Sequence, residues 1–328
     1  MKAIHVVNPG KKARLKIGET KRPSPGPNQL LVKVEATALN RADLHQKGGK
    51  YPPPEGASEI LGLEMAGIVE ETGEQVTRLK PGDFVFGLLP GGGYAEFCVI
   101  HERLAMPLPE SLSFVQAAAI PETFLTAYQA LNWLGGLTRS ETVLIHAGGS
   151  GVGTAAIQLA HHLVNARVVT TAGKQRKLEA ALKLGANYAF NYRKADWAEA
   201  VEDELGKNAV NLVVDFIGAP YWEQNMRVLA MDGRLVYLSF LGGHKLKKAS
   251  LGALLRKRLT LTGSTLRNRP ESYKIKLTSE FADHTLDLFE QEVLRPVVDR
   301  QFDWSEADEA HRYMADDKNT GKIVLTGM

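Results

Sequence analysis

The feature that most constrains the fold is a glycine-rich turn between a predicted strand and a predicted helix. Residues 142–146 form a short apolar run, residues 146–153 read His-Ala-Gly-Gly-Ser-Gly-Val-Gly, and apolar side chains then recur at helical spacing. Small residues here let the backbone approach a pyrophosphate, whose charge the free N–H groups of a helix N-terminus stabilise. Ser150 stands where the usual pattern has glycine, but the context favours a dinucleotide site over a turn without a ligand.

Strand and helix patterns alternate on both sides of this turn. The helices between the strands carry apolar side chains four residues apart, as at Trp197, Val201 and Leu205. This rhythm indicates right-handed crossovers and predicts an α/β domain, a Rossmann-type doubly wound parallel sheet, over residues 122–263. The strands are expected at residues 142–146, 167–171, 188–190, 212–215, 234–237 and 259–262.

The residues before this domain follow a different pattern. Leu30, Val32, Val34 and Ala36 alternate with other side chains at period two, and clusters of proline and glycine separate such runs. Residues 1–121 are therefore expected to form a mostly-β domain.

The crossover rhythm stops after residue 263. A helix is expected over residues 281–293, with Ala282, Leu286, Phe289 and Val293 on one face, and a last strand over residues 322–325. Since residues 264–328 have no sheet of their own, we expect them to return to the first domain.

Composition excludes several classes of protein. With 44% hydrophobic and 23% charged residues in 328, the chain is typical of a globular protein and too apolar for a disordered one. A net charge of +3 gives no support to a nucleic-acid partner. The single cysteine, Cys98, rules out an intrachain disulfide and any zinc site that needs two thiolates. No stretch suits a membrane span or a secretory signal, so we expect a cytoplasmic protein without a membrane partner.

Charge at the end of the second strand of the α/β domain indicates the type of dinucleotide. NAD-binding domains place an acidic residue about twenty residues past the glycines. Here no acid occurs before Glu179, while Lys174, Arg176 and Lys177 supply three bases. A 2′-phosphate pairs with basic groups and is repelled by a carboxylate, so the sequence favours NADPH.

Several motifs occur in order over nearly the whole length of the chain. They are residues 39–44, 49–54, 60–64, 118–122, 146–153 and 321–324. With these motifs the chain resembles the zinc-free medium-chain dehydrogenases/reductases of the quinone oxidoreductase group. The resemblance implies a GroES-like first domain, NADPH as hydride donor, a quinone as small-molecule substrate and a homodimer or homotetramer.

The resemblance also implies that there is no metal site. The alcohol dehydrogenase branch holds a catalytic zinc with cysteine and histidine ligands, and Asn40 and Leu63 stand at the matching positions. Neither is a useful zinc ligand. Alcohol oxidation is difficult without a Lewis acid, whereas an ortho-quinone or a similar electron-poor acceptor takes a hydride with modest help from hydrogen bonds.

The matching positions imply roles for individual residues. Asn40 and Tyr51 are the candidate donors of hydrogen bonds to the quinone oxygen, although Tyr51 is equally well explained as a wedge beside its prolines. Gly151 and Val152 would meet the pyrophosphate. Around the 2′-phosphate we expect Gly173, Lys174, Lys177 and Tyr192, and around the nicotinamide Phe240, Leu241, Gly242, Gly263, Ser264, Thr265, Asn40, Asp43 and Thr126.

Two alternatives stay open. An enone or alkenal reductase of the same superfamily would use the same cofactor and site. A crystallin-like or RNA-binding protein that binds NADPH with little catalysis is the second alternative, and the small net charge gives its RNA-binding form little support.

Overall fold

The computed structural model describes all 328 residues and divides into two compact units. Unit 1 comprises Met1–Leu125 and Arg267–Met328, and unit 2 comprises Thr126–Leu266. The domain boundaries expected after residues 121 and 263 stay predictions. No helix is both long and apolar enough to span a lipid bilayer.

Unit 2 contains the predicted doubly wound sheet. Its six strands lie in the order β10-β9-β8-β11-β12-β13, and every neighbouring pair is parallel. The order reverses direction at β8, which places the glycine-rich turn at the switch point of the sheet. The strands are β8 (Thr142–Ile145), β9 (Arg167–Ala172), β10 (Tyr188–Asn191), β11 (Val210–Asp215), β12 (Leu229–Tyr237) and β13 (Thr260–Gly263).

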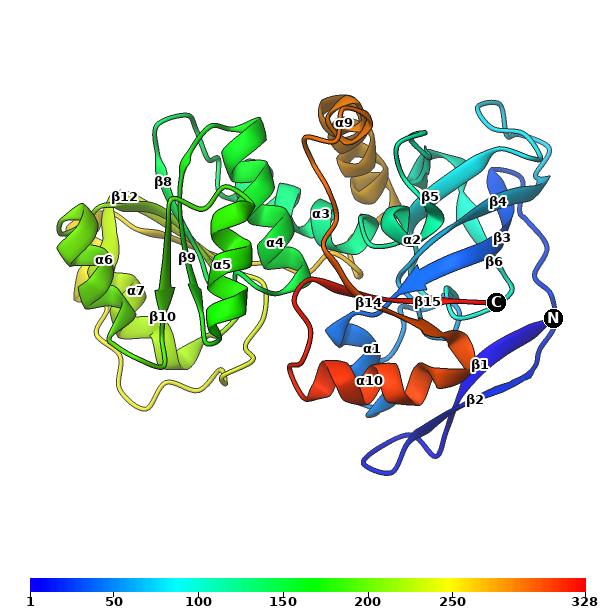
Figure 1. Ribbon diagram of the computed structural model, residues 1–328, viewed down its shortest axis with the longest axis horizontal. Helices are drawn as coiled ribbons and strands as arrows, with labels where there is room; N and C mark the ends of the chain where they lie inside the picture. Colours follow the sequence, from blue (N-terminus) through cyan, green and yellow to red (C-terminus); the bar gives the residue numbers. More distant parts are fainter. The chain divides into compact units, whose positions relative to one another are not determined.

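Helices cover both faces of this sheet (Figure 1). Helices α4 (Gly151–Gln158) and α5 (Gln175–Lys183) lie on one face, and α6 (Trp197–Leu205) and α7 (Trp222–Val228) lie on the other. Trp197, Val201 and Met226 pack on buried side chains of the sheet. The four-residue spacing of apolar side chains therefore correctly predicted which helix face packs on the sheet. The short helix α8 (Gly252–Lys257) precedes β13, and α3 (Pro121–Tyr128) begins in unit 1.

Unit 1 is built on a mixed sheet of seven strands. The order is β14-β15-β3-β4-β5-β7, with β6 also paired to β3, and a separate hairpin joins β1 to β2. The strands are β1 (Lys2–Val7), β2 (Arg14–Glu19), β3 (Gln29–Ala38), β4 (Glu64–Thr72), β5 (Phe84–Leu88), β6 (Phe97–His101), β7 (Ala105–Pro107), β14 (Val298–Asp303) and β15 (Lys322–Thr326).

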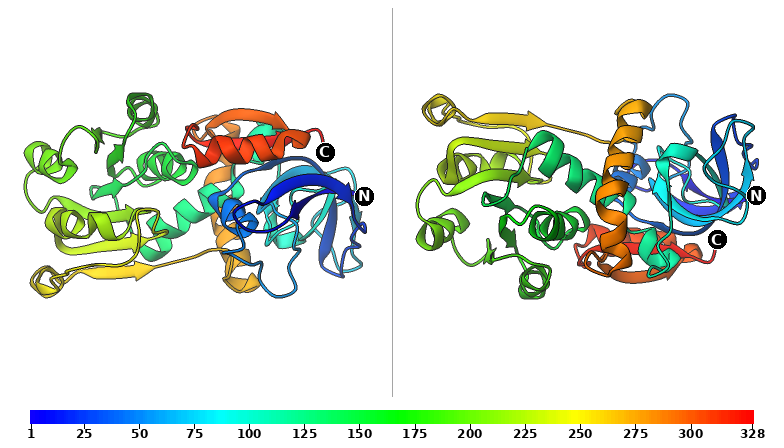
Figure 2. Two further views of the ribbon diagram at one scale, coloured as in Figure 1. Left: turned by 90° about the horizontal axis from the view of Figure 1, so that it is seen from below. Right: turned by 90° about the horizontal axis from the view of Figure 1, so that it is seen from above.

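The C-terminal segment contributes strands and helices to unit 1. The final strand β15 pairs antiparallel with β3, and β14, which the sequence did not predict, pairs parallel with β15 at the sheet edge. Figure 2 shows this segment, coloured orange to red, against the blue and cyan strands. Its helices are α9 (Glu271–Glu290) and α10 (Ala307–Ala315), and two short helices complete the unit, α1 (Arg41–Lys47) and α2 (Phe114–Ala117).

The predicted bounds of the last long helix are wrong. Helix α9 begins ten residues earlier than expected, directly after Pro270, and ends at Glu290. Its core face is made by Leu277, Phe281 and Phe289, while Val293 lies beyond the helix and is 38% exposed.

Candidate functional site

A buried polar network in unit 1 joins three segments that are far apart in the sequence. Asn40 precedes α1, Glu64 begins β4 and Lys322 begins β15. Glu64 is fully buried and Lys322 is 4% exposed. Because β15 lies beside β3, the C-terminal strand delivers Lys322 to the end of β3, where Asn40 follows.

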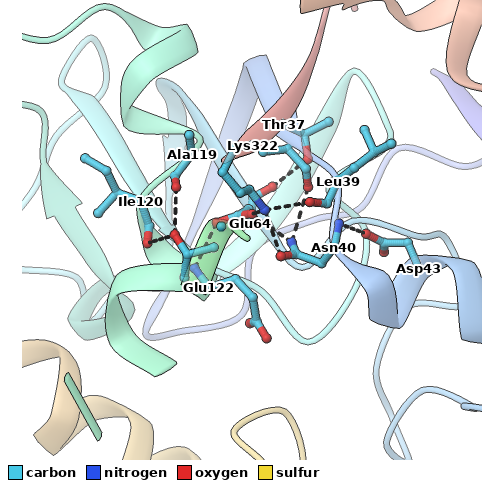
Figure 3. Close-up of polar contacts among 12 residues, drawn as sticks. Thr37, Leu39, Asn40, Asp43, Glu64, Ala119, Ile120, Glu122 and Lys322 are labelled. Carbon is cyan, nitrogen blue, oxygen red and sulfur yellow. Dashed lines mark hydrogen bonds and ion pairs between the residues drawn. The ribbon is translucent and has the colours of Figure 1, made fainter. Parts of the chain in front are cut away.

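The ammonium group of Lys322 has an acceptor for each of its three protons. Its Nζ donates to Leu39 O at 2.6 Å, to Asn40 Oδ1 at 2.7 Å and to Glu64 Oε1 at 2.7 Å (Figure 3). The buried ion pair is therefore fully hydrogen-bonded on the lysine side, which is the condition for tolerating charges away from water.

The same network fixes the side chain of Asn40, one of the two predicted acceptor-binding residues. Its Nδ2 donates to Glu64 Oε1 at 2.7 Å and to Ala38 O at 3.3 Å. Both amide protons are thus directed at protein acceptors. A substrate oxygen could receive a hydrogen bond from Asn40 only by replacing the longer bond to Ala38.

Asp43, predicted to line the cofactor, is buried and bound to the backbone around it. Its Oδ2 accepts from the Asn40 N–H at 2.7 Å, and its Oδ1 accepts from the Gly62 N–H at 3.1 Å. Burial raises the pKa of Asp43 to about 6, against the lowering effect of these two amides. In this position Asp43 closes the first turn of α1, and its role toward a cofactor stays a prediction.

Glu122, at the second position of α3, connects this network to further ionisable groups. Its N–H donates to Glu64 Oε2 at 2.8 Å, while its own carboxyl group points away from the network (Figure 3). Burial and the neighbouring Glu64 carboxylate raise the pKa of Glu122 to about 8. At neutral pH the Glu122 carboxyl is therefore mostly protonated and can donate a hydrogen bond or a proton.

Tyr51 is half-buried beside the same group. Burial and the Glu122 carboxylate raise the pKa of its hydroxyl, and Arg267 opposes this effect. The guanidinium carbon of Arg267 lies 5.3 Å from the centre of the Tyr51 ring. Both predicted acceptor-binding residues, Asn40 and Tyr51, thus adjoin the region around Glu122.

The raised pKa of Glu122 predicts a pH-dependent stability. An acid whose pKa is higher in the folded state binds more protons folded than unfolded, so stability falls as pH rises from about 5 to about 8. Replacing Glu122 with glutamine removes this contribution. Melting temperatures measured at pH 5 to 9 should show that the E122Q variant gains on wild type as pH rises and that the gain levels off above pH 8. A constant difference between the two proteins would contradict the assignment.

The glycine-rich turn of unit 2 prepares the start of α4. Ser150 is the N-cap residue, and its Oγ accepts from the Gly153 N–H at 3.0 Å. This leaves Gly151 and Val152 in the first turn, where no carbonyl of the helix can reach their N–H groups. A Cβ at Gly153 would lie 2.3 Å from Ala147 O, so only glycine lets the helix pass this close to the turn.

The structure brings the residues predicted for the adenosine phosphate to one end of this sheet. A Cβ at Gly149 would lie 2.6 Å from Lys177 Cδ, so the stem of Lys177 crosses the glycine turn. A Cβ at Gly173 would lie 2.6 Å from the Tyr192 hydroxyl and 2.8 Å from Arg193 Nε. Arg193 is an additional base that the sequence pattern did not indicate, because it follows the third strand and not the second.

The other residues predicted for the cofactor follow strand ends of the same sheet. Since all six strands are parallel, their carboxyl ends all lie on the same side of the sheet. Lys174 follows β9, Phe240, Leu241 and Gly242 follow β12, Gly263 ends β13, and Ser264 and Thr265 come next. Phe240 and Leu241 are 51% and 48% exposed. Thr126 lies on α3, whereas Asn40, Asp43 and Tyr51 belong to unit 1.

A buried histidine, His146, forms hydrogen bonds close to the carboxyl ends of these strands. His146 Nδ1 lies 2.9 Å from Thr171 Oγ1, and its Nε2 lies 2.9 Å from Asn225 Oδ1. Asn225 Nδ2 in turn donates to Asp215 Oδ2 at 2.6 Å. Burial lowers the pKa of His146, so the ring stays neutral and acts as a connector between the ends of β8, β9 and β11.

Comparisons with known proteins identify the family. Residues 26–110 match the family model "Alcohol dehydrogenase GroES-like domain", and residues 151–283 match "Zinc-binding dehydrogenase". Quinone oxidoreductase-like protein 2 of Bos taurus is 30% identical over 301 residues, which cover 92% of this chain and 85% of that protein. The chain belongs to the quinone oxidoreductase group of the medium-chain dehydrogenases/reductases. It is thus an oxidoreductase with a GroES-like and a Rossmann-type domain, as the sequence motifs implied.

Solved structures of the same family superpose over nearly the whole chain. An NAD-dependent alcohol dehydrogenase is 32% identical, with a TM-score of 0.87 and 100% of both chains covered. Escherichia coli quinone oxidoreductase complexed with NADPH is 28% identical, with a TM-score of 0.86 and 99% of both chains covered. The CurK enoyl reductase is 27% identical, with a TM-score of 0.86, over 99% of this chain and 98% of that one. Relatives with similar sequence identity to this medium-chain dehydrogenase/reductase therefore differ in cofactor and substrate.

Proposed function

We propose that the protein is an NADPH-dependent reductase that passes a hydride to ortho-quinones and similar electron-poor acceptors without zinc. What supports this proposal is the chemistry of Asn40 and Leu63, the two residues that the resemblance matches to the positions of the family's catalytic metal ligands. Asn40 is held there by Lys322 and Glu64, and Leu63 is a buried apolar residue. No group of three or more histidine, cysteine, aspartate or glutamate side chains is placed to hold a metal ion.

The residues at the carboxyl ends of the strands in unit 2 have the chemistry that NADPH needs. The first-turn N–H groups of Gly151 and Val152 suit a pyrophosphate, because a helix N-terminus favours negative charge. Lys174 and Arg193 place positive charge beside Gly173 and Tyr192, and Lys177 adds positive charge at the glycine-rich turn, and a 2′-phosphate pairs with such groups. NADPH, when bound, supplies the hydride from its nicotinamide ring.

The unit 1 residues act on the acceptor. Tyr51 has a hydroxyl that can donate to a carbonyl oxygen, and the Asn40 amide can do so by exchanging its bond to Ala38. Glu122 carries a proton near neutral pH, which makes it a candidate donor to the reduced oxygen. A quinone needs no more polarisation than these donors supply.

Similarity to the CurK enoyl reductase supports a second candidate, a reductase of enones or alkenals. The rate of NADPH oxidation with 1,2-naphthoquinone, compared with that for trans-2-hexenal, separates the two. We expect the larger kcat/KM for the quinone, and a larger value for the alkenal would establish the second candidate instead. NADPH binding with no turnover on either acceptor would contradict both and favour the non-catalytic alternative.

A further inference from the structure

A buried guanidinium in unit 1 has two donor groups that the protein does not use. Arg267 is 4% exposed, and its Nε donates to Pro90 O at 2.9 Å. Its Nη1 and Nη2 are buried and have no acceptor within hydrogen-bond distance. Buried polar groups are almost always hydrogen-bonded, and leaving one unpaired destabilises the folded protein, more so for a charged group. The arrangement therefore indicates a position where a ligand supplies the acceptors.

The groups around Arg267 favour a ligand with negative charge. Lys274, on α9, lies next to it, with its Nζ 3.4 Å from Arg267 O. The carboxyl groups that act on the pKa of Arg267 are those of Asp43 and Glu122, and both raise it. Both have a raised pKa, of about 6 and about 8, and both Asp43 oxygens already accept amide hydrogen bonds. Near neutral pH Glu122 is mostly protonated, Glu271 acts on Lys274, and no carboxylate is bonded to the Arg267 guanidinium itself.

Geometry narrows the ligand further. The two Nη groups of a guanidinium lie in one plane and pair best with two oxygens that are adjacent in space. The Tyr51 ring, 5.3 Å from the guanidinium carbon, offers an aromatic surface beside them. The two oxygens of an ortho-quinone, and of the catecholate formed from it, are adjacent on one aromatic ring. Those of a para-quinone lie on opposite sides of the ring, so only one of them can reach the guanidinium.

We propose that Arg267 is a specificity-determining residue that binds the two adjacent oxygens of an ortho-quinone or catecholate. This inference rests on the proposed function. It adds one residue to the proposed acceptor site and assigns the preference for vicinal oxygens to that side chain.

Binding of non-reducible coloured ligands tests the proposal without turnover. The probes are 4-nitrocatechol, 4-nitroguaiacol, in which one oxygen is methylated, and 4-nitrobenzoate. Calorimetry and absorbance titration give their dissociation constants for wild type, Arg267→Met and Arg267→Lys. Arg269→Met is the matched control, since it makes the same change two residues away, and melting curves check that each variant folds.

Wild type should bind 4-nitrocatechol about 10-fold to 100-fold more tightly than 4-nitroguaiacol, as expected for one lost bond to a charged donor. Arg267→Met should abolish this difference, Arg267→Lys should retain a small part of it, and Arg269→Met should leave it unchanged. Equal binding of the two ligands by wild type would overturn the proposal, whether or not the variants fold. Tighter binding of 4-nitrobenzoate than of 4-nitrocatechol would overturn the assignment to vicinal oxygens.

Cofactor binding separates this inference from the proposed function. Arg267→Met should leave the dissociation constant of NADPH unchanged, and an equal loss of NADPH and 4-nitrocatechol binding would overturn the inference by assigning Arg267 to the cofactor. If wild type bound no NADPH at all, the proposed function would fail. The discrimination between 4-nitrocatechol and 4-nitroguaiacol would still decide the role of Arg267.

Discussion

Replacing Lys322 with methionine should lower the free energy of unfolding by about 3–5 kcal/mol, the cost of leaving one partner of a buried ion pair alone. Glu64 is fully buried, and Lys322 supplies the only opposite charge bonded to it, at 2.7 Å. The change also removes a donor from Leu39 O and Asn40 Oδ1. Denaturant unfolding, followed by circular dichroism, measures the effect.

Two further variants test the origin of this effect. Adding Glu64→Gln to Lys322→Met should restore part of the stability, because the uncompensated charge is then gone. Lys318→Met is the control: Lys318 pairs with Asp316 at 2.9 Å, but both side chains are more than half exposed, so the pair is worth at most about 1 kcal/mol. Similar losses for Lys318→Met and Lys322→Met would contradict the buried network.

Replacing Lys177 with alanine should weaken NADPH binding by about 10-fold to 100-fold, since a bond between charged groups contributes about 1.5–3 kcal/mol. NADH lacks the 2′-phosphate, so its dissociation constant should change little. Lys177 is placed for this role because its stem crosses the turn at Gly149. Nucleotide fluorescence, titrated at fixed ionic strength, gives both constants.

Lys183→Ala is the matched control on the same helix. Lys183 ends α5 and is exposed, so its removal changes the net charge of the protein by the same amount. It should leave the preference for NADPH over NADH intact. Equal weakening of both nucleotides by Lys177→Ala would show that this residue stabilises the turn and does not bind the phosphate.

The parallel sheet of unit 2 was predictable because its inner strands β8, β9 and β11 are buried on both faces. All four residues of β8 are buried, and such short apolar runs stand out in the sequence. The edge strand β14 was missed because its residues, Val298 to Asp303, are mostly polar and only Phe302 is buried. Helix α9 was placed too late because its first ten residues contain only one buried apolar residue, Leu277.

The site was predictable only where the chemistry lies within one motif. Asn40 lies in one of the motifs that the chain shares with the family. Its partners Glu64 and Lys322 are 24 and 282 residues away in the sequence. Their contact depends on β15 pairing with β3, which no local pattern encodes. Arg267 was missed for the same reason, since burial and unused donors are properties of the fold. A charged residue at the first position of a buried strand, as at Glu64, was the one available signal.

Turnover and metal content measured on one sample decide whether hydride transfer in this protein needs zinc. NADPH oxidation by 1,2-naphthoquinone is followed after chelator treatment, and the zinc content per chain is determined on the same protein. We expect full activity with far less than one zinc per chain and no gain when zinc is restored. Activity that disappears with the chelator and returns in proportion to bound zinc would contradict this expectation.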